Sequence, residues 1–227
     1  MDRYWYFRER RFFRGDVASR EALFIARSTR VALRRGDMAF FEGDPGDSCY
    51  YVESGLMRLF SVTDAGRDPV LFLRGPGEML GMAEAINRYP RRASAQALVP
   101  TVLHHLSSQD LESLLEHDYP LARRVITLLG GRFRFLNESA FSAPSPLDRL
   151  VNLLISLVYD QLEDGHWERP ACVPFPLPDD MAASITGLPL ASIATLMASL
   201  RAAGLIRLEG GHICLPNPAH LVSRAGG

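Results

Sequence analysis

One segment near the C-terminal end constrains the fold of this chain more than any other. Residues 187–206 have the sequence GLPLASIATLMASLRAAGLI. Apolar side chains recur there at the spacing i, i+3, i+4 and i+7, the stripe of a helix packed on a core, at Ile193, Leu196, Met197 and Leu200. Residues 177–186 predict a shorter helix that Gly187 ends. The segment therefore predicts two helices joined by a tight turn.

The outer face of the second helix has unusual chemistry for a helix-turn-helix. It presents Leu190, Ala191, Ala194, Thr195 and Ala198. A helix that contacts DNA bases normally does so with Arg, Lys, Asn or Gln, because these side chains match the hydrogen-bonding groups of base edges. After Gly204, LIRLEGGHICL predicts a two-strand hairpin that turns at Gly210-Gly211, in the position of a wing.

Composition excludes several classes of protein. The 227 residues are 47% hydrophobic and 22% charged, which is ordinary for a globular chain of one or two domains. No run approaches the length of a membrane span, and arginines interrupt the N-terminus where a secretory signal would be apolar, so we expect a cytoplasmic protein. The cysteines lack C-x-x-C spacing, which argues against a disulfide framework, a structural zinc site or an iron–sulfur cluster. We expect buried or idle thiols at Cys49, Cys172 and Cys214.

Positive charge is concentrated at the N-terminal end. Residues 1–35 hold ten arginines and four acidic residues, whereas residues 171–227 hold three of each and are neutral. The chain has no lysine. Aromatic residues alternate with arginine in YWYFRERRFFR (residues 4–14), and such a segment either stacks on nucleotides or lies across a β-domain with its aromatics buried. We favour the second interpretation.

The remainder of the sequence predicts a β-rich half followed by helices. From Val31 to about Leu106, short aromatic and branched runs alternate with glycine turns, as in a β-sandwich or barrel, and no helix-length periodic stretch interrupts them. One helix, QDLESLLEH, is predicted after a cap at Ser108, and a longer one starts at Asp118. Residues 142–146 form a breaker-rich hinge, residues 147–162 predict an amphipathic helix, and residues 163–176 a loop.

The long helix after Asp118 carries an apolar stripe at Leu121, Val125, Leu128, Leu129 and Leu136. Gly130-Gly131 weakens the helix by about 1 kcal/mol per glycine relative to alanine, so it depends on packing. A long helix with an apolar stripe between two domains is suited to dimerisation. We predict this stripe as a dimer interface. The alternative is that the helix lies on its own β-domain.

Three blocks of sequence carry a family resemblance. RRGDMAFFEGDPGDSCYYVESGLMRLF, DAGRDPVLFLRGPGEMLG and RRASAQAL resemble the cyclic-nucleotide-binding β-roll of the Crp–Fnr (catabolite activator/fumarate-nitrate) regulators. PLARRVITLLGGRFRFL resembles their dimerisation helix, and LPDDMAASITGLPLASIATLMASLRAAGLI, with its hairpin, resembles their winged helix-turn-helix. The resemblance implies an α+β fold with a β-roll (jelly-roll) sensor at 1–107, dimerisation helices at 108–142 and a winged helix-turn-helix at 143–227.

The resemblance also implies an effector site, but with altered contacts. Gly81 matches the family's Gly-Glu-Leu segment, with Met82 where the ribose-binding Glu would be, followed by Ala83. Glu84 would lie on the same face as Met82 if the segment were extended. Arg91 matches the phosphate-binding arginine and Arg92 replaces the adjacent serine, while Arg134 and Phe135 take the positions that face the base. An unmodified cyclic-AMP site is not expected; a changed nucleotide or small-anion pocket, or no pocket, remain open.

Other cofactors find little support in the sequence. Six histidines are available as axial ligands, but nothing in their spacing singles one out, so haem is not expected. The β segment has no histidine before His104, and no G-x-S-x-G, H-E-x-x-H or P-loop pattern occurs. An enzyme of the cupin type is therefore not expected either.

The helix-turn-helix departs from the family's pattern Gly-x-Ser-Arg-Glu-Thr-Val-x-Arg. Pro189 replaces the capping Ser and is acceptable at a first helical position. The base-contacting Arg, Glu and Arg become Leu190, Ala191 and Thr195, and Ser192 replaces the Thr. Contacts with thymine methyl groups, DNA bending, and phosphate contacts from arginines such as Arg201 would have to compensate.

We therefore predict a homodimeric, effector-responsive transcription regulator that binds double-stranded DNA, with RNA polymerase as a further partner and no membrane association. The alternative is a sensor or interaction dimer that has lost sequence-specific DNA binding. The neutral C-terminal 57 residues favour that alternative, because phosphate neutralisation drives DNA affinity.

Overall fold

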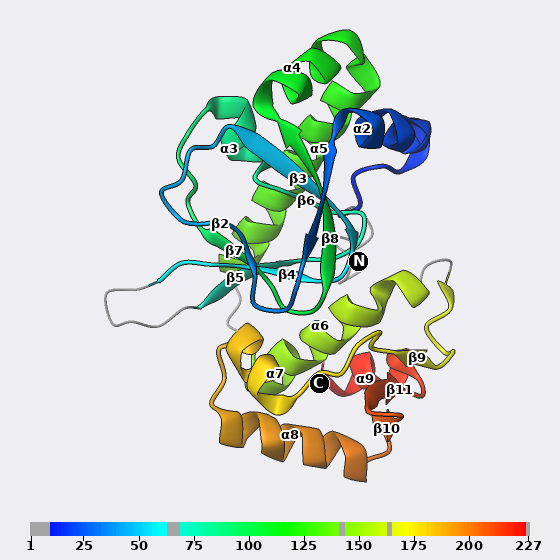
Figure 1. Cartoon of the computed structure of the whole chain (residues 1–227). Helices are drawn as coiled ribbons and strands as arrows, with labels where there is room; N and C mark the ends of the chain where they lie inside the picture. The colour runs from blue at the N-terminus through cyan, green and yellow to red at the C-terminus, as the bar shows by residue number, and fades with distance from the viewer. Residues whose placement is uncertain (1–9, 63–68, 141–143, 163–164, 226–227) are drawn as a thin grey trace. The chain divides into compact units, whose positions relative to one another are not determined.

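The computed structural model describes residues 10–62, 69–140, 144–162 and 165–225. The chain divides into two compact units, an N-terminal unit of residues 1–140 and a C-terminal unit of residues 141–227 (Figure 1). The further division of the N-terminal unit into a sensor and separate dimerisation helices remains a prediction.

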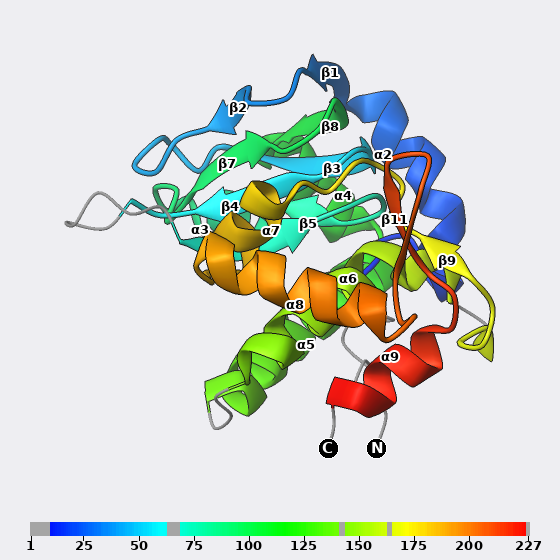
Figure 2. The ribbon, with the colours of Figure 1, turned by 90° about the horizontal axis from the view of Figure 1, so that it is seen from below.

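Two four-stranded antiparallel sheets form the centre of the N-terminal unit. One has the strand order β1-β8-β3-β6 and the other β2-β7-β4-β5. Figure 2 shows β7, β4 and β5 side by side. The strands are β1 (Thr29–Leu33), β2 (Met38–Phe40), β3 (Ser48–Ser54), β4 (Met57–Phe60), β5 (Val70–Arg74), β6 (Met79–Leu80), β7 (Ser94–Ala97) and β8 (Thr101–Ser107). This arrangement confirms the predicted β-roll.

The first sheet is covered on both faces, which explains why β3 is apolar at successive positions. Side chains such as Val52 and Leu103, which lie opposite each other in the register, pack between the two sheets with Met57 of β4. Alternate residues, such as Tyr51, point to a second core on the other face. Because successive side chains of a strand point to opposite faces, a strand with two cores needs apolar residues throughout.

The second core is completed by helices and by the N-terminal segment. Its helical elements are the 3₁₀ helix η1 (Gly15–Arg20), α2 (Glu21–Arg27), α3 (Met82–Asn87), α4 (Ser108–His117) and α5 (Tyr119–Ala140). Phe12 is buried there, with its ring 4.8 Å from that of Phe13 and 6.5 Å from that of Phe24. For this residue the favoured interpretation, an N-terminal segment that lies across the β-domain, is confirmed. Residues 4–9 of the aromatic stretch lie outside the described residues.

Two local predictions in this unit were wrong. The helix α3 interrupts the β region, where none was expected. Its six residues are too few for a periodic pattern, and left-handed residues, Gly81 (φ 69°) and Arg88 (φ 56°), flank it. The cap of α4 is Ser107 rather than Ser108, because the Ser107 hydroxyl accepts a hydrogen bond from the backbone N–H of Asp110.

The C-terminal unit combines helices with a small sheet. Its elements are α6 (Pro146–Val158), the 3₁₀ helix η2 (Tyr159–Gln161), β9 (Ala171–Cys172), α7 (Asp179–Thr186), α8 (Leu190–Ala202), β10 (Arg207–Glu209), β11 (His212–Leu215) and α9 (Pro218–Ala225). A capping box between Ser145 and Asp148 starts α6. The predicted hairpin is present, since β10 and β11 pair around Gly210-Gly211.

The third strand, β9, lies where a loop was predicted. It joins β11 to give the order β10-β11-β9. Two residues are too few to show alternation in the sequence, and only the neighbouring strand reveals them as a strand. The short helix α9 was likewise not predicted.

The interpretation of all three cysteines as idle thiols was also wrong. Cys172 of β9 and Cys214 of β11 are register partners and form a disulfide, with 4.0 Å between their Cα atoms. They are 42 residues apart in the sequence, so no spacing motif could reveal the pair. Cys49 is free and buried, and burial raises the pKa of its thiol from 9.0 to about 12.

Among the described helices, none taken singly is long and apolar enough to cross a membrane. The pair α7 and α8 meets the length and composition test only when taken together, and it is bent by 112°.

Candidate functional site

The helices α7 and α8 form the predicted helix-turn-helix. Gly187, with φ 68°, ends α7 in the left-handed conformation, and α8 begins three residues later at Leu190. The angle of 112° between the helices lies in the range of about 90–120° that is typical of helix-turn-helix pairs. The turn therefore sets α8 across α7, which leaves one long face of α8 outside the core.

The two faces of α8 divide as the sequence predicted. Ile193, Met197 and Leu200 are buried. The outward positions are exposed, at Leu190, Ala191, Ala194, Thr195 and Ala198. Ser192 is half-buried, and Arg201 is exposed in the last turn of the helix. The exposed face of α8 is thus made of small or apolar side chains with one arginine at its far end.

Local hydrogen bonds restrict this face further. Pro189 occupies the N-cap position rather than the first helical position, and it offers no side-chain cap. The Thr195 hydroxyl donates to the carbonyl oxygen of Ala191 at 2.9 Å. With its proton engaged, this hydroxyl can contribute only its lone pairs or its methyl group to a ligand. The α8 face can therefore recognise a partner mainly by shape and by apolar contact.

Arg91 is the most unusual residue of the N-terminal unit. Its side chain is buried, and its guanidinium donates to the carbonyl oxygen of Ser48 at 2.7 Å and to that of Gly81 at 3.1 Å. The group also lies over the ring of Phe40, 4.3 Å from the centroid. Its Nε has no hydrogen-bond partner, and no carboxylate among the described residues pairs with it. A buried cation without an opposite charge is costly, and the hydrogen bonds to Gly81 and Ser48 offset part of that cost.

Gly81 is fitted to this arginine. A Cβ built at Gly81 would lie 2.3 Å from Nη1 of Arg91, and the residue has a positive φ of 69°. Both the close approach and the backbone conformation require glycine. The sequence placed Gly81 and Arg91 in one site by resemblance, and the structure joins them by a hydrogen bond.

The other predicted effector residues lie in different surroundings. The segment after Gly81 is helical rather than extended, so Glu84 does not share a face with Met82 in the way that was considered. Met82 is fully buried in the core, Ala83 and Glu84 are half-buried, and Arg92 is exposed. A hollow of about 350 Å³ nearby is lined by Gly43, Pro45, Gly46, Asp47, Arg88 and Pro90, and by none of the predicted effector residues.

Arg134 and Phe135 lie near the end of α5, where Arg134 is exposed and Phe135 is half-buried. Two residues earlier, Arg132 donates to the carbonyl oxygen of Met79 at 3.0 Å and so ties α5 to β6. The part of α5 that carries Arg134 and Phe135 is therefore held against the strand that leads into Gly81.

Most of the predicted dimer stripe faces inward. Leu121, Val125 and Leu128 are buried in the core of the same unit, and Leu129 packs against that core. This face follows the alternative, a helix lying on its own β-domain, and contact of these three side chains with a partner subunit remains an untested prediction. Leu136 is exposed, so its assignment to a dimer interface remains a prediction.

A second apolar row on α5 was predicted only in part, at Leu129 and Leu136. Tyr119, Ile126 and Phe133 repeat every seven residues and are 75%, 70% and 67% exposed. Ala122, Leu129 and Leu136 follow each of them by three residues. Together they form an a/d heptad pattern, which we call the outer row of α5. The repeat is visible in the sequence, but the leucine-rich inner stripe is the stronger signal there because leucine is the commoner residue of a packed helix face.

Comparison with known proteins places these features in context. A model of the family described as "Cyclic nucleotide-binding domain" matches residues 30–118. The transcriptional activator protein Anr of Pseudomonas aeruginosa is 25% identical over 198 residues, which covers 86% of this chain and 80% of that protein. The cyclic AMP receptor protein of Thermus thermophilus is 27% identical over 203 residues, covering 88% and 90%.

Solved structures agree on the fold. FixK2 from Bradyrhizobium japonicum has a TM-score of 0.72 with 20% identity, and the match covers 86% of this chain and 96% of that chain. The catabolite activator protein of Thermus thermophilus has a TM-score of 0.52 with 26% identity, covering 95% and 98%. The matches extend through both units, so the β-roll and the helix-turn-helix are similar to those of such proteins in the same order.

Proposed function

Because the chain belongs to the Crp–Fnr family of transcription regulators, we propose that two copies bind one DNA duplex, each with α8 in the major groove, under the control of an anion that binds at Arg91. The chain is a DNA-binding transcription regulator of this family, and its named relatives are regulators rather than enzymes. The mode of DNA recognition, the dimer contact and the effector are the proposal. Contact with RNA polymerase is proposed from family membership alone.

The exposed face of α8 is the observation that carries the DNA-binding part. Small side chains at Ala191, Ala194 and Ala198 let the helix backbone approach the bases closely, and they can pack on thymine methyl groups. Arg201 offers a phosphate contact at the other end of the helix. Because this face lacks base-reading hydrogen-bond groups, specificity rests on methyl contacts and on the deformability of the duplex.

The outer row of α5 supports the dimer. Tyr119, Ile126 and Phe133 are large apolar side chains on the solvent side of a 22-residue helix whose inner stripe is already buried. An exposed a/d row of this length pairs with a second copy of itself in a two-stranded coiled coil. Two α8 helices related by the resulting two-fold axis would match the two half-sites of a palindromic operator.

Selection of bound fragments from randomised duplexes tests DNA recognition. We expect A·T-rich sites and an affinity that falls with salt on a log–log plot. Ala194→Glu should weaken binding at least about tenfold, because it sets a carboxylate against the phosphates. Thr127→Glu, which adds the same charge on an exposed turn of α5, is the matched control.

The neutral charge of the last 57 residues favours one second candidate, a dimer that no longer binds DNA. It predicts no salt-dependent retention of the wild type on any duplex. That outcome, with a dimer still present in light scattering, would replace the first proposal by the second.

The dimer has its own test. We expect Ile126→Asp with Phe133→Asp to give a monomer in light scattering, because two carboxylates would be buried in the seam. Thr127→Asp should remain dimeric. A dimer that survives the double substitution would show that the outer row of α5 is not the interface.

The effector proposal rests on the buried charge of Arg91. Inorganic phosphate, cyclic AMP and cyclic GMP are the probes, and thermal unfolding is the measurement. A ligand at a hundred times its Kd stabilises the protein by about 2.7 kcal/mol. Arg91→Met should abolish the shift, whereas Arg74→Met, which removes another buried arginine of the same unit, should retain it. No shift for the wild type with any probe would leave Arg91 as a structural residue.

A further inference from the structure

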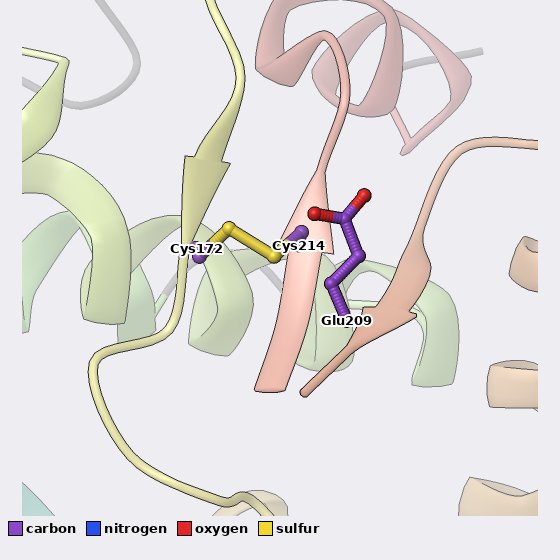
Figure 3. A group of neighbouring side chains, drawn as sticks. All are labelled: Cys172, Glu209 and Cys214. Carbon is purple, nitrogen blue, oxygen red and sulfur yellow. A yellow bond between two sulfur atoms is a disulfide. The ribbon is translucent and has the colours of Figure 1, made fainter. Parts of the chain in front are cut away.

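The three-stranded sheet of the C-terminal unit brings together two sulfur atoms and a carboxylate. Cys172 and Cys214 are paired across β9 and β11, and Glu209 stands at the end of β10 on the other side of β11 (Figure 3). Their potential ligand atoms all lie within 4.8 Å of one another. No motif in the sequence and no part of the proposed function uses this cluster.

Strand register explains why the three side chains meet. Arg207 is the β10 partner of Cys214, and Glu209 follows Arg207 by two residues, so both share the face of Cys214. In Figure 3 the Glu209 carboxylate reaches along this face toward Cys214. The cluster is therefore a product of the sheet and does not depend on a flexible loop.

The donor set fits a thiophilic divalent cation once the disulfide is opened. Two molecules of a low-molecular-weight thiol, RSH, reduce the disulfide to two thiols and leave as RSSR. The two soft thiolates and the one hard carboxylate oxygen are all ligands that Zn²⁺ takes. Around a tetrahedral Zn²⁺, with bonds of about 2.0–2.3 Å, ligand atoms lie roughly 3.5–4 Å apart. All the potential ligand atoms lie within 4.8 Å of one another, and reduction, which breaks the S–S bond, lets the two sulfur atoms move apart to this spacing.

The backbone holds the ligands in place independently of the S–S bond. The Gln161 side chain makes two hydrogen bonds with the backbone of Cys172. Its Nε2 donates to the Cys172 carbonyl oxygen at 2.7 Å, and its Oε1 accepts from the Cys172 N–H at 3.0 Å. Cys214 lies on the central strand, between β9 and β10. Opening the disulfide would therefore leave both cysteine backbones in place, so that the sulfur atoms separate by rotation of the side chains alone.

The cluster is accessible to solvent from one side. Cys214 is buried, Cys172 is half-buried and Glu209 is exposed, so the cluster opens to solvent at the carboxylate. His212 is the register partner of Glu209, and its Nδ1 lies 2.9 Å from the Val173 carbonyl oxygen. Arg207 is the one arginine of the three strands, and it is exposed.

We propose that Cys172, Cys214 and Glu209 form a redox-gated site for a thiophilic divalent cation of the Zn²⁺ class. The reduced pair binds the ion with release of two thiol protons. A low-molecular-weight disulfide, RSSR, removes it: one cysteine sulfur attacks RSSR and releases RS⁻, and the second attacks the resulting mixed disulfide. The products are the Cys172–Cys214 bond, a second RS⁻ and free Zn²⁺. The site does not depend on DNA binding or on an effector.

Cobalt substitution in the full chain tests the proposal, because thiolate–Co²⁺ bonds give a charge-transfer absorption that carboxylate and histidine sites lack. The reduced protein, freed of reductant under anaerobic conditions, should bind one Co²⁺ per chain with this absorption and with the visible bands of tetrahedral Co²⁺. Zn²⁺ should abolish both. The oxidised protein should show neither, which is a comparison that needs no substitution.

Substitutions assign the ligands. Cys172→Ser and Cys214→Ser should lose the charge-transfer band, and Glu209→Gln should weaken binding at least about tenfold. Cys49→Ser, which removes the free cysteine of the other unit, is the matched control and should bind as the wild type does. Reduced wild type without the band, or a band that survives Cys172→Ser, would overturn the proposal. An unchanged affinity of Glu209→Gln for Co²⁺ would show that the Glu209 carboxylate is not a ligand.

Discussion

The two units of this protein treat polar side chains in opposite ways. Among the described residues, every buried polar or charged side chain lies in the N-terminal unit, at Ser48, Arg74, Glu78, Arg91, Ser94, Thr101, His104 and Ser108. The buried side chains of the C-terminal unit are hydrophobic, Tyr159 and Cys214 included. One unit buries charge in its interior, and the other presents an almost uncharged face on α8.

The difference separates a unit that can respond to charge from one that cannot. Most buried polar groups of the N-terminal unit are satisfied internally; Glu78, for example, accepts from the Gly75 N–H at 2.6 Å. Arg91, by contrast, has no carboxylate partner among the described residues, and its Nε has no hydrogen-bond partner. A charge that folding leaves uncompensated can respond to a ligand, whereas an apolar core responds mainly to packing. This contrast favours the β-roll as the place of the proposed effector.

The largest difference between the two units is expected in the rate at which their cysteines are alkylated. A pKa of about 12 leaves the Cys49 thiol with about a thousandfold less thiolate than a thiol of pKa 9.0 at neutral pH. After reduction of the folded protein, the half-buried Cys172 should be alkylated well before Cys49, as measured by mass spectrometry. Equal labelling of Cys172 and Cys49 at low extent would contradict the burial of Cys49.

Two glycines with nearly the same φ, one in each unit, allow the cost of a Gly→Ala substitution to be compared between the units. Gly81 (φ 69°) faces Arg91, whereas Gly187 (φ 68°) has open space where a Cβ would be. The left-handed backbone alone costs about 1–2 kcal/mol for alanine, so Gly187→Ala should lower the free energy of unfolding by about that amount. Gly81→Ala should cost at least about 3 kcal/mol, since the buried guanidinium must also move. Urea unfolding measures both, and equal costs would mean that Arg91 yields freely.

The uncharged face of α8 can be given the chemistry that it lacks. Thr195→Arg should steepen the slope of log affinity against log salt by about 0.9 if the new side chain meets one phosphate. A guanine contact would add about 1–3 kcal/mol of base discrimination. Binding titrations at several salt concentrations measure the slope, and Arg35→Thr serves as a charge control on an exposed loop. An unchanged slope would place Thr195 away from the duplex.

The smallest effect is expected at Glu53. Hydrogen bonds from His104, 2.7 Å away, and from Arg30 lower the pKa of its carboxyl group. A carboxyl whose pKa is lower in the folded state stabilises the protein above its unfolded pKa, and this stability is lost as the pH falls through the folded pKa. Glu53→Gln should therefore lower Tm slightly at about pH 7, and the difference should shrink as the pH falls below the ordinary range of a carboxyl pKa. A difference independent of pH would mean that the ion pair contributes nothing.

Sequence reasoning succeeded where the signal was local. The helix-turn-helix followed from the stripe Ile193, Met197 and Leu200 and from Gly187, and the hairpin from Gly210-Gly211, because spacing and backbone freedom act within a few residues. It did not distinguish the inner stripe of α5 from the outer row of α5, because both rows are regular in the sequence. Only the β-roll, by packing against Leu121, Val125 and Leu128, decides which row is covered.

The candidate sites were predicted unevenly for the same reason. Gly81 and Arg91 were paired through resemblance, but the inward direction of the arginine depends on carbonyl groups of Ser48 and Gly81. The disulfide and the neighbouring Glu209 were missed entirely, because β9 and β11 are 42 residues apart at their cysteines.

By itself, the sequence determined the order of the β-rich half and the longer helices, the two-helix motif and the chemistry of its outer face, since these depend on side-chain type and short-range spacing. The tertiary structure alone decided which row of α5 stays exposed, that Arg91 is buried without an opposite charge, and that two distant cysteines meet. Those outcomes depend on which surfaces compete for the same core and on which strands become neighbours, and neither is encoded within any one segment.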